Sequence, residues 1–98
     1  MSLPIVFRAA ARAEFDQAAE WYERQQAGLG GAFVASVQQV LDNIAATPQR
    51  YPAVFGDVRE GIVPRFPYCV YYRVRANQVR VLAIFHTSRD PSIWQARA

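Results

Sequence analysis

The stretch YCVYYRVRANQVRVLAIFH, residues 68–86, decides the fold. Residues 68–75 alternate between two faces and residues 79–86 form a second extended segment, so both predict β-strands. The residues between them, 76–78, are too few for a crossover and predict a tight antiparallel hairpin. Residues 81–85 are apolar on both faces, which is typical of a central strand that is covered on each side. The C-terminal tail or a partner chain would supply the second covering layer.

Two helical patterns precede this hairpin. Apolar residues recur at helical spacing between residues 11 and 22, and again between residues 33 and 44. Glycines separate the two patterns, so we expect the helices to form an antiparallel helical hairpin. The acidic residues of the first helix are interpreted as a solvent-exposed face, and these are Glu14, Asp16, Glu20 and Glu23.

Shorter strands complete the predicted fold. Residues 4–7 form a short apolar run, and residues 58–63, weakened by Gly61, precede a bend at residues 64–67. The expected order is strand, helix, helix, strand, strand, strand and a short tail. This order, β-α-α-β-β-β, predicts an α+β fold in which a helical hairpin packs on a small, mostly antiparallel sheet. Residues 1–98 are expected to form one domain.

The composition excludes several classes of protein. The chain is 52% hydrophobic and has no low-complexity segment, so it is globular rather than disordered. Its longest apolar run is too short to span a membrane, and no segment is typical of a signal peptide. We therefore expect a cytoplasmic protein in which the one cysteine, Cys69, is a buried thiol. No spacing is typical of a metal site or a phosphate-binding loop, so no cofactor is expected.

All eleven basic residues are arginines, and the formal net charge is +3. Biased codon usage would explain the absence of lysine. Alternatively, guanidinium groups bind phosphates and carboxylates in a bidentate way, which favours an acidic partner without requiring nucleic acid. Four arginines of the predicted sheet region and tail are candidates for contact with a target or a phosphate, namely Arg59, Arg65, Arg73 and Arg89.

The only histidine, His86, follows the last predicted strand and precedes Arg89 by three residues. In an RNA-cleaving enzyme His86 would be the general acid, arginines would stabilise the phosphorane, and Glu60 would be the nearest candidate base. The alternative is structural. His86 would then be a hydrogen-bonded strand end, Arg89 would cap that turn or pair with Asp90, and Trp94 would pack on the core. The residues alone leave both interpretations open.

The order of several motifs resembles the RelE/ParE superfamily of bacterial toxins, and more narrowly its ParE-like branch, often called plasmid stabilisation proteins. The motifs are AEFDQAAEWYERQQAGLGGAF, RFPYCVYYRV and LAIFHTSRDPSIW, and the resemblance covers about residues 5–97. It implies the toxin of a type II toxin–antitoxin pair, which a cognate antitoxin neutralises. Operator DNA would be bound only through the antitoxin. A homodimer and a hetero-oligomer with the antitoxin both stay open.

The resemblance implies two alternative targets. ParE-type members poison DNA gyrase and need no catalytic residue, whereas RelE-type members cleave mRNA on the ribosome. This chain has no lysine, and no tyrosine follows Trp94, so we favour a non-catalytic gyrase poison. In the alternative, a ribosome-dependent mRNA endonuclease, His86 would be catalytic. A third alternative is a chain that binds an antitoxin without being toxic.

Overall fold

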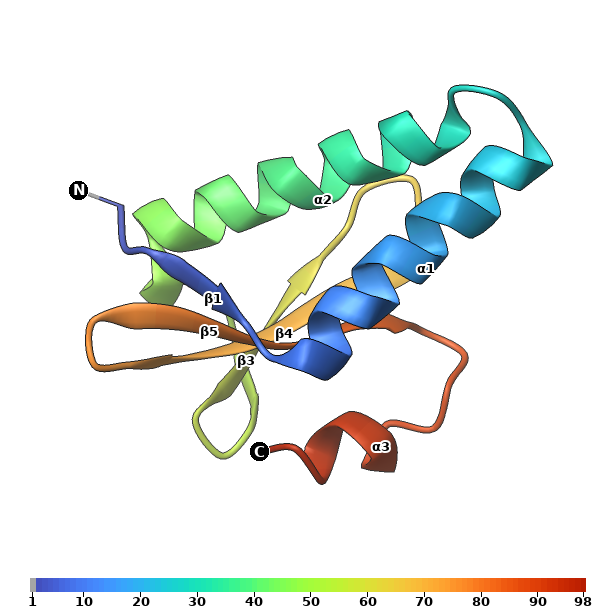
Figure 1. Cartoon of the computed structure of the whole chain (residues 1–98). Helices are drawn as coiled ribbons and strands as arrows, with labels where there is room; N and C mark the ends of the chain where they lie inside the picture. The colour runs from blue at the N-terminus through green and yellow to red at the C-terminus, as the bar shows by residue number, and fades with distance from the viewer. Residues whose placement is uncertain (1) are drawn as a thin grey trace.

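The computed structural model describes residues 2–98, which form one sheet with helices on both of its faces (Figure 1). In chain order the elements are β1 (Ile5–Phe7), α1 (Ala9–Gln25), α2 (Leu29–Ala46), the 3-10 turn η1 (Pro48–Arg50), β2 (Ala53–Phe55), β3 (Val58–Ile62), β4 (Tyr68–Arg75), β5 (Gln78–His86) and α3 (Ser92–Gln95). The predicted α+β order is confirmed. None of the described helices is long and apolar enough to cross a bilayer.

The strand order in the sheet is β1-β5-β4-β3-β2. The pairs β2–β3, β3–β4 and β4–β5 are antiparallel, whereas β1 pairs with β5 in parallel. The mostly antiparallel sheet is therefore confirmed, and β5 lies inside it between β1 and β4. The sequence did not predict β2, because its three residues are all exposed and show no alternation.

The β4–β5 turn uses a backbone conformation that favours hairpins. Ala76 and Asn77 have φ angles of 52° and 57°. Two successive residues with positive φ match the right-handed twist of the flanking strands, which brings the strands together without splaying.

A bulge in β5 decides which of its side chains face which side of the sheet. Pairing with β4 shifts by one residue at this point, so Leu82 is an extra residue in the strand. Val81 packs under the helices, Leu82 and Ala83 both belong to the core on the opposite face, and Ile84 returns to the helix side. Every later side chain of β5 is therefore inverted relative to a regular strand.

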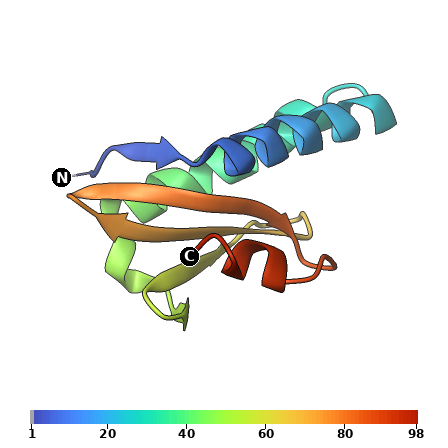
Figure 2. The same ribbon diagram turned by 60° about the horizontal axis from the view of Figure 1, so that its bottom comes forward.

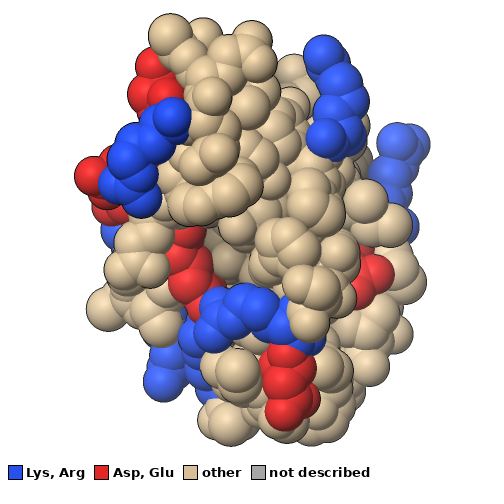
Figure 3. All heavy atoms as spheres, turned by 90° about the vertical axis from the view of Figure 1, so that its right-hand side faces the viewer, with Lys and Arg blue, Asp and Glu red and all other residues tan. Residues whose placement is uncertain are grey.

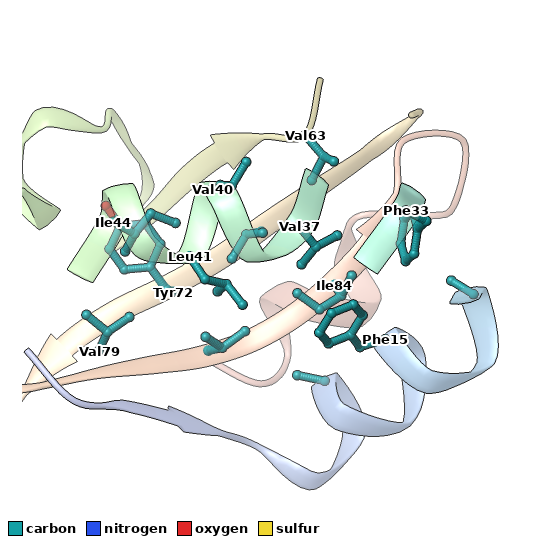
Figure 4. Close-up of a cluster of buried hydrophobic side chains, with 14 residues drawn as sticks. Phe15, Phe33, Val37, Val40, Leu41, Ile44, Val63, Tyr72, Val79 and Ile84 are labelled. Carbon is teal, nitrogen blue, oxygen red and sulfur yellow. The ribbon is translucent and has the colours of Figure 1, made fainter. Parts of the chain in front are cut away.

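The larger core lies between the helical hairpin and the sheet (Figure 4). Helix α1 contributes Phe15, α2 contributes residues from Phe33 to Ile44, and the sheet contributes Tyr72 and Ile84. The Tyr72 hydroxyl donates a 2.6 Å hydrogen bond to the Pro48 carbonyl in η1. This buried polar group is therefore satisfied, and burial raises the pKa of Tyr72 to about 12.

A smaller core covers the face of the sheet opposite α1 and α2, which we call the underside. Helix α3 lies against it (Figure 2). Trp94 is 3% exposed and stacks on Tyr71 with ring centroids 4.0 Å apart. Phe55 meets the same indole edge-on at 5.8 Å. The tail thus supplies the second layer that the apolar run in β5 requires, and the expected packing of Trp94 is confirmed.

The turn between α1 and α2 depends on two glycines and one carboxylate. Gly28 has a φ of 89°, which other residues rarely adopt. The Glu23 carboxylate accepts hydrogen bonds from the amides of Gly28 and Gly30, which satisfies free donors at the start of α2. Glu23 is exposed as predicted, but it also fixes this turn.

Close contact between the two helices requires Gly30. A Cβ there would lie 2.5 Å from the carbonyl oxygen of Ala19 and 2.9 Å from the Cβ of Glu23. At Gly31, one position along the same helix, a Cβ would meet nothing within 4 Å. Gly30 and Gly31 therefore provide a matched comparison between a glycine packed against the other helix and one with open space beside it.

We expect Gly30→Ala to lower the free energy of unfolding by about 1–3 kcal/mol, because the added methyl group forces the helices apart. We expect Gly31→Ala to leave it unchanged or to raise it by up to about 1 kcal/mol, because alanine favours a helix. Urea denaturation of both variants checks this. Equal effects at the two positions would show that the helices can separate at no cost.

Candidate functional site

A pocket of about 520 Å³ opens between α1 and the carboxyl end of β5. Its apolar wall is largely aromatic, with Trp21, Tyr22 and Tyr68, and its polar groups include Glu14, His86 and Arg89. Trp21 is 52% exposed, although it is a large aromatic side chain. Figure 3 shows this end of the molecule, where arginine and carboxylate side chains touch beside uncharged surface.

The β5 bulge directs His86 into this pocket. His86 lies opposite Tyr68 in the strand register, and its ring meets the Tyr68 ring edge-on at 5.1 Å. Both side chains lie on the helix side of the sheet, where Tyr68 packs against the larger core. In a strand without the extra residue Leu82, His86 would face the underside instead.

The hydrogen bonds of His86 fix its tautomer. Its Nδ1 accepts a hydrogen bond from the Ser88 amide at 3.0 Å, and the Ser88 hydroxyl lies 2.8 Å from the same nitrogen. A nitrogen that accepts from an amide carries no proton, so the proton of the neutral ring is on Nε2. His86 Nε2 is therefore a hydrogen-bond donor, and Nδ1 is already engaged by Ser88.

The Glu14 carboxylate joins three parts of the chain. It accepts hydrogen bonds from the Ile84 amide at 3.2 Å, from Arg89 at 2.9 Å and from Arg97 at 2.9 Å. The strand β1 ends at Phe7 and so leaves this edge of β5 without a neighbouring strand. Glu14 takes the place of that strand for one amide.

The prediction that Glu14 belongs to a solvent-exposed face is wrong, since its side chain is only 12% exposed. The helical position that carries it faces β5, where the guanidinium groups compensate the cost of burying a carboxylate. Asp16 and Glu20 do form exposed pairs with arginines four residues away, as expected from their spacing.

Arg89 pairs with Glu14 and not with Asp90. Its guanidinium also lies over the Phe85 ring, 4.4 Å from the centroid, and its side chain is 42% exposed. The Asp90 carboxylate instead accepts a hydrogen bond from the Ser92 amide, which lowers the pKa of Asp90 and starts α3. Arg89 therefore has an internal partner, which is Glu14 rather than Asp90.

Arg97 also belongs to this cluster, and no sequence motif singles it out. Its side chain is 13% exposed, and it donates to the Leu82 carbonyl at 3.0 Å as well as to Glu14. The bond to Leu82 ties the tail to the bulge itself. No local pattern could have identified Arg97, because both of its partners are distant in sequence.

The structure does not bring the four predicted arginines together. Arg59 donates to the backbone carbonyls of Gln49 and Tyr51, beside the end of α2. Arg65 lies in the β3–β4 turn with a φ of 69° and lines a second pocket against the start of α2. Arg73 is bound to Asp57 at 2.8 Å and is 14% exposed. Of the four, only Arg89 lines the same pocket as His86.

Glu60 and His86 lie on opposite faces of the sheet. The Glu60 carboxylate accepts a 2.8 Å hydrogen bond from the Tyr71 hydroxyl on the underside, whereas His86 faces the helices. Burial, aided by this bond to Glu60, raises the pKa of Tyr71. The acid and the base suggested for RNA cleavage are therefore not assembled. Residues 2–98 also contain no cluster of side chains that could hold a metal ion.

Comparisons with known proteins agree with one another. A family model described as the ParE toxin of the type II toxin–antitoxin system, parDE, matches residues 5–91. A chain in the solved structure of the chromosomal ParDE TA system from P. aeruginosa is similar in fold, with a TM-score of 0.77 and 15% sequence identity. The match covers 89% of the present chain and 98% of that chain. No curated protein sequence matches significantly.

We expect Glu14→Gln to lower the free energy of unfolding by about 3 kcal/mol, because two guanidinium groups, one of them largely buried, lose their counter-charge. Glu20→Gln, on the same helix, removes only the ion pair with Arg24, in which the Arg24 side chain is 65% exposed and the Glu20 side chain is 71% exposed. It should cost less than about 1 kcal/mol. Thermal and urea denaturation of both variants check the contrast. If the two substitutions lowered the free energy of unfolding equally, the ion pairs of Glu14 would not stabilise the fold more than an exposed pair does.

Proposed function

We propose that this chain, which belongs to the ParE family of toxins of type II toxin–antitoxin systems, acts by binding DNA gyrase rather than by catalysis, and that a cognate antitoxin neutralises it. The observation that carries the proposal is the state of the pocket's acid–base groups. His86 Nδ1 already accepts from Ser88, and the Glu14 carboxylate already accepts from two arginines. Both gyrase and an antitoxin would meet the toxin in the cytoplasm.

A binding role fits the remaining groups of the pocket. Catalysis by proton transfer needs an acid and a base that both reach the substrate, and Glu60 lies on the other face of the sheet. The half-exposed Trp21 and the cation of Arg89 are instead the kinds of side chain that dominate protein–protein interfaces. The pocket therefore suits a side chain of a protein partner, with Arg89 beside an acidic group of that partner.

The other predicted arginines remain candidates for contact with the target, but they are not equally free to make it. Arg65 lies on the surface of the β3–β4 turn, where it is free to contact a target. Arg59 and Arg73 each already bind a group of the chain itself, so contact with a target would be additional to an internal bond. Arg89 and Arg65 are therefore the first candidates for target binding.

The alternative, a ribosome-dependent mRNA endonuclease, rests on one specific observation. The Nε2 proton of His86 and the Arg89 guanidinium belong to the same pocket, and both could donate hydrogen bonds to a phosphate. In that case His86 would be the general acid, and its loss would cost about a hundred- to ten-thousand-fold in cleavage.

The two functions predict different effects of the same variants. For a gyrase poison, His86→Ala should retain inhibition of DNA synthesis, while Arg89→Gln should weaken target binding by about 2 kcal/mol, or roughly 30-fold. Arg24→Gln is the control, because it removes an exposed arginine of α1. After induction, incorporation of labelled thymidine and methionine shows whether DNA synthesis or protein synthesis falls first. An assay with purified gyrase then gives the inhibition constant of each variant.

An early fall in methionine incorporation that His86→Ala abolishes would instead establish the endonuclease. Melting temperatures of the purified variants show whether a loss of activity reflects unfolding. If induction of the wild-type chain changed neither label, the family membership would remain and the gyrase target would be refuted.

A further inference from the structure

Helix α3 covers only part of the underside of the sheet. The turn end of the β4–β5 hairpin extends beyond α3 (Figure 2). Along this uncovered part, Val6 of β1 pairs with Arg80 of β5, and Arg80 pairs with Arg73 of β4. The neighbours of Arg80 in β5, Val79 and Val81, both face the helices, so the arginine side chains of this row face away from them.

Alternation places two further arginines on the same face. Arg75 lies two residues after Arg73 in β4, and Arg8 lies two residues after Val6. The Arg8 amide continues the pairing with β5, since it donates to the Val81 carbonyl at 2.9 Å. We call this surface the hairpin arginine patch, and it consists of Arg8, Arg73, Arg75 and Arg80 together with Asp57.

The patch carries uncompensated positive charge. Asp57 binds Arg73 at 2.8 Å and Arg75 at 3.4 Å, whereas Arg8 and Arg80 form no ion pair within residues 2–98. Arg73 and Arg80 are direct cross-strand partners, and like charges in that position destabilise a sheet. A neutral residue at position 80 would make a more stable hairpin, so this arrangement points to an anionic partner.

We propose that the hairpin arginine patch binds the phosphate backbone of double-stranded DNA. Guanidinium groups bind phosphate in a bidentate way, and protein–DNA interfaces are polar and strongly positive. Protein–protein interfaces instead have an apolar core with aromatic residues. In the row Val6–Arg80–Arg73, two of the three side chains are guanidinium groups and the third, Val6, is 43% exposed. The patch therefore differs in kind from the aromatic pocket beside α1.

This inference deepens the proposed function and rests on it for the biological setting, because gyrase acts on DNA and a toxin bound to it lies next to a duplex. The aromatic pocket would contact the protein and the hairpin arginine patch would contact the DNA. The two surfaces lie on opposite faces of the sheet, so Arg80→Gln, the substitution used below, removes no group that lines the pocket. DNA binding by the purified chain can fail while gyrase inhibition stands, and the reverse also holds.

The test measures binding of the purified chain to a fluorescein-labelled 20-base-pair duplex by anisotropy at several salt concentrations. The wild-type chain should bind with an affinity that falls as salt rises, and each phosphate contact should add about 0.9 to the slope of log affinity against log salt. Arg80→Gln should weaken binding and reduce this slope by about 0.9. Its melting temperature should equal or exceed that of the wild type, since a like-charge pair is lost.

Arg50→Gln is the matched control, because Arg50 is an exposed arginine in η1 and its loss changes the net charge equally. It should leave the salt slope unchanged. An equal loss in both variants would overturn the proposal in favour of a general effect of net charge. Absence of binding by the wild type at low salt would also overturn it, as would binding to an acidic polypeptide such as polyglutamate but not to the duplex.

Discussion

The hydrogen bond from the Ile84 amide to the Glu14 carboxylate joins the helical layer to the central strand at the point where β1 no longer reaches. The same carboxylate holds Arg89 at the pocket and Arg97 in the tail. Glu14 is only 12% exposed, and two guanidinium groups and one amide compensate its charge, so the positions of Glu14, the bulge and both arginines depend on one another. Two members of this cluster, Glu14 and Arg89, line the pocket, so the cluster fixes part of its polar wall.

The sheet separates two chemically different surfaces. On the helix side, aromatic rings and one half-exposed arginine surround a pocket. On the underside, the apolar half is covered by α3 and the other half carries the arginines of the β4–β5 hairpin. This division follows from the bulge at Leu82, which keeps Val81 and Ile84 under the helices while it places Leu82 and Ala83 against Trp94. A strand with two apolar faces therefore serves two separate layers in a chain of 98 residues.

Much of the fold could be predicted from local patterns, whereas the site could not. The strand at residues 68–75 and both helices follow from periodicity, and the apolar run in β5 required a second layer. Periodicity does not show where an extra residue enters a strand, and that one residue decides the face on which His86 lies. The buried role of Glu14 and the inclusion of Arg97 depend on contacts about 70 and 83 positions apart in sequence. The separation of Glu60 from His86 likewise appears only once strand register is known.

The position of β5 in the sheet has a consequence for how the chain is made. Ile5 of β1 pairs with Val79 of β5, so within residues 2–98 an edge strand near one end of the chain has a strand near the other end as its neighbour. Contacts between such distant segments form late and fold slowly. The sheet core and the pocket both use residues of β5. Neither can therefore form before β5 has paired with its two neighbouring strands.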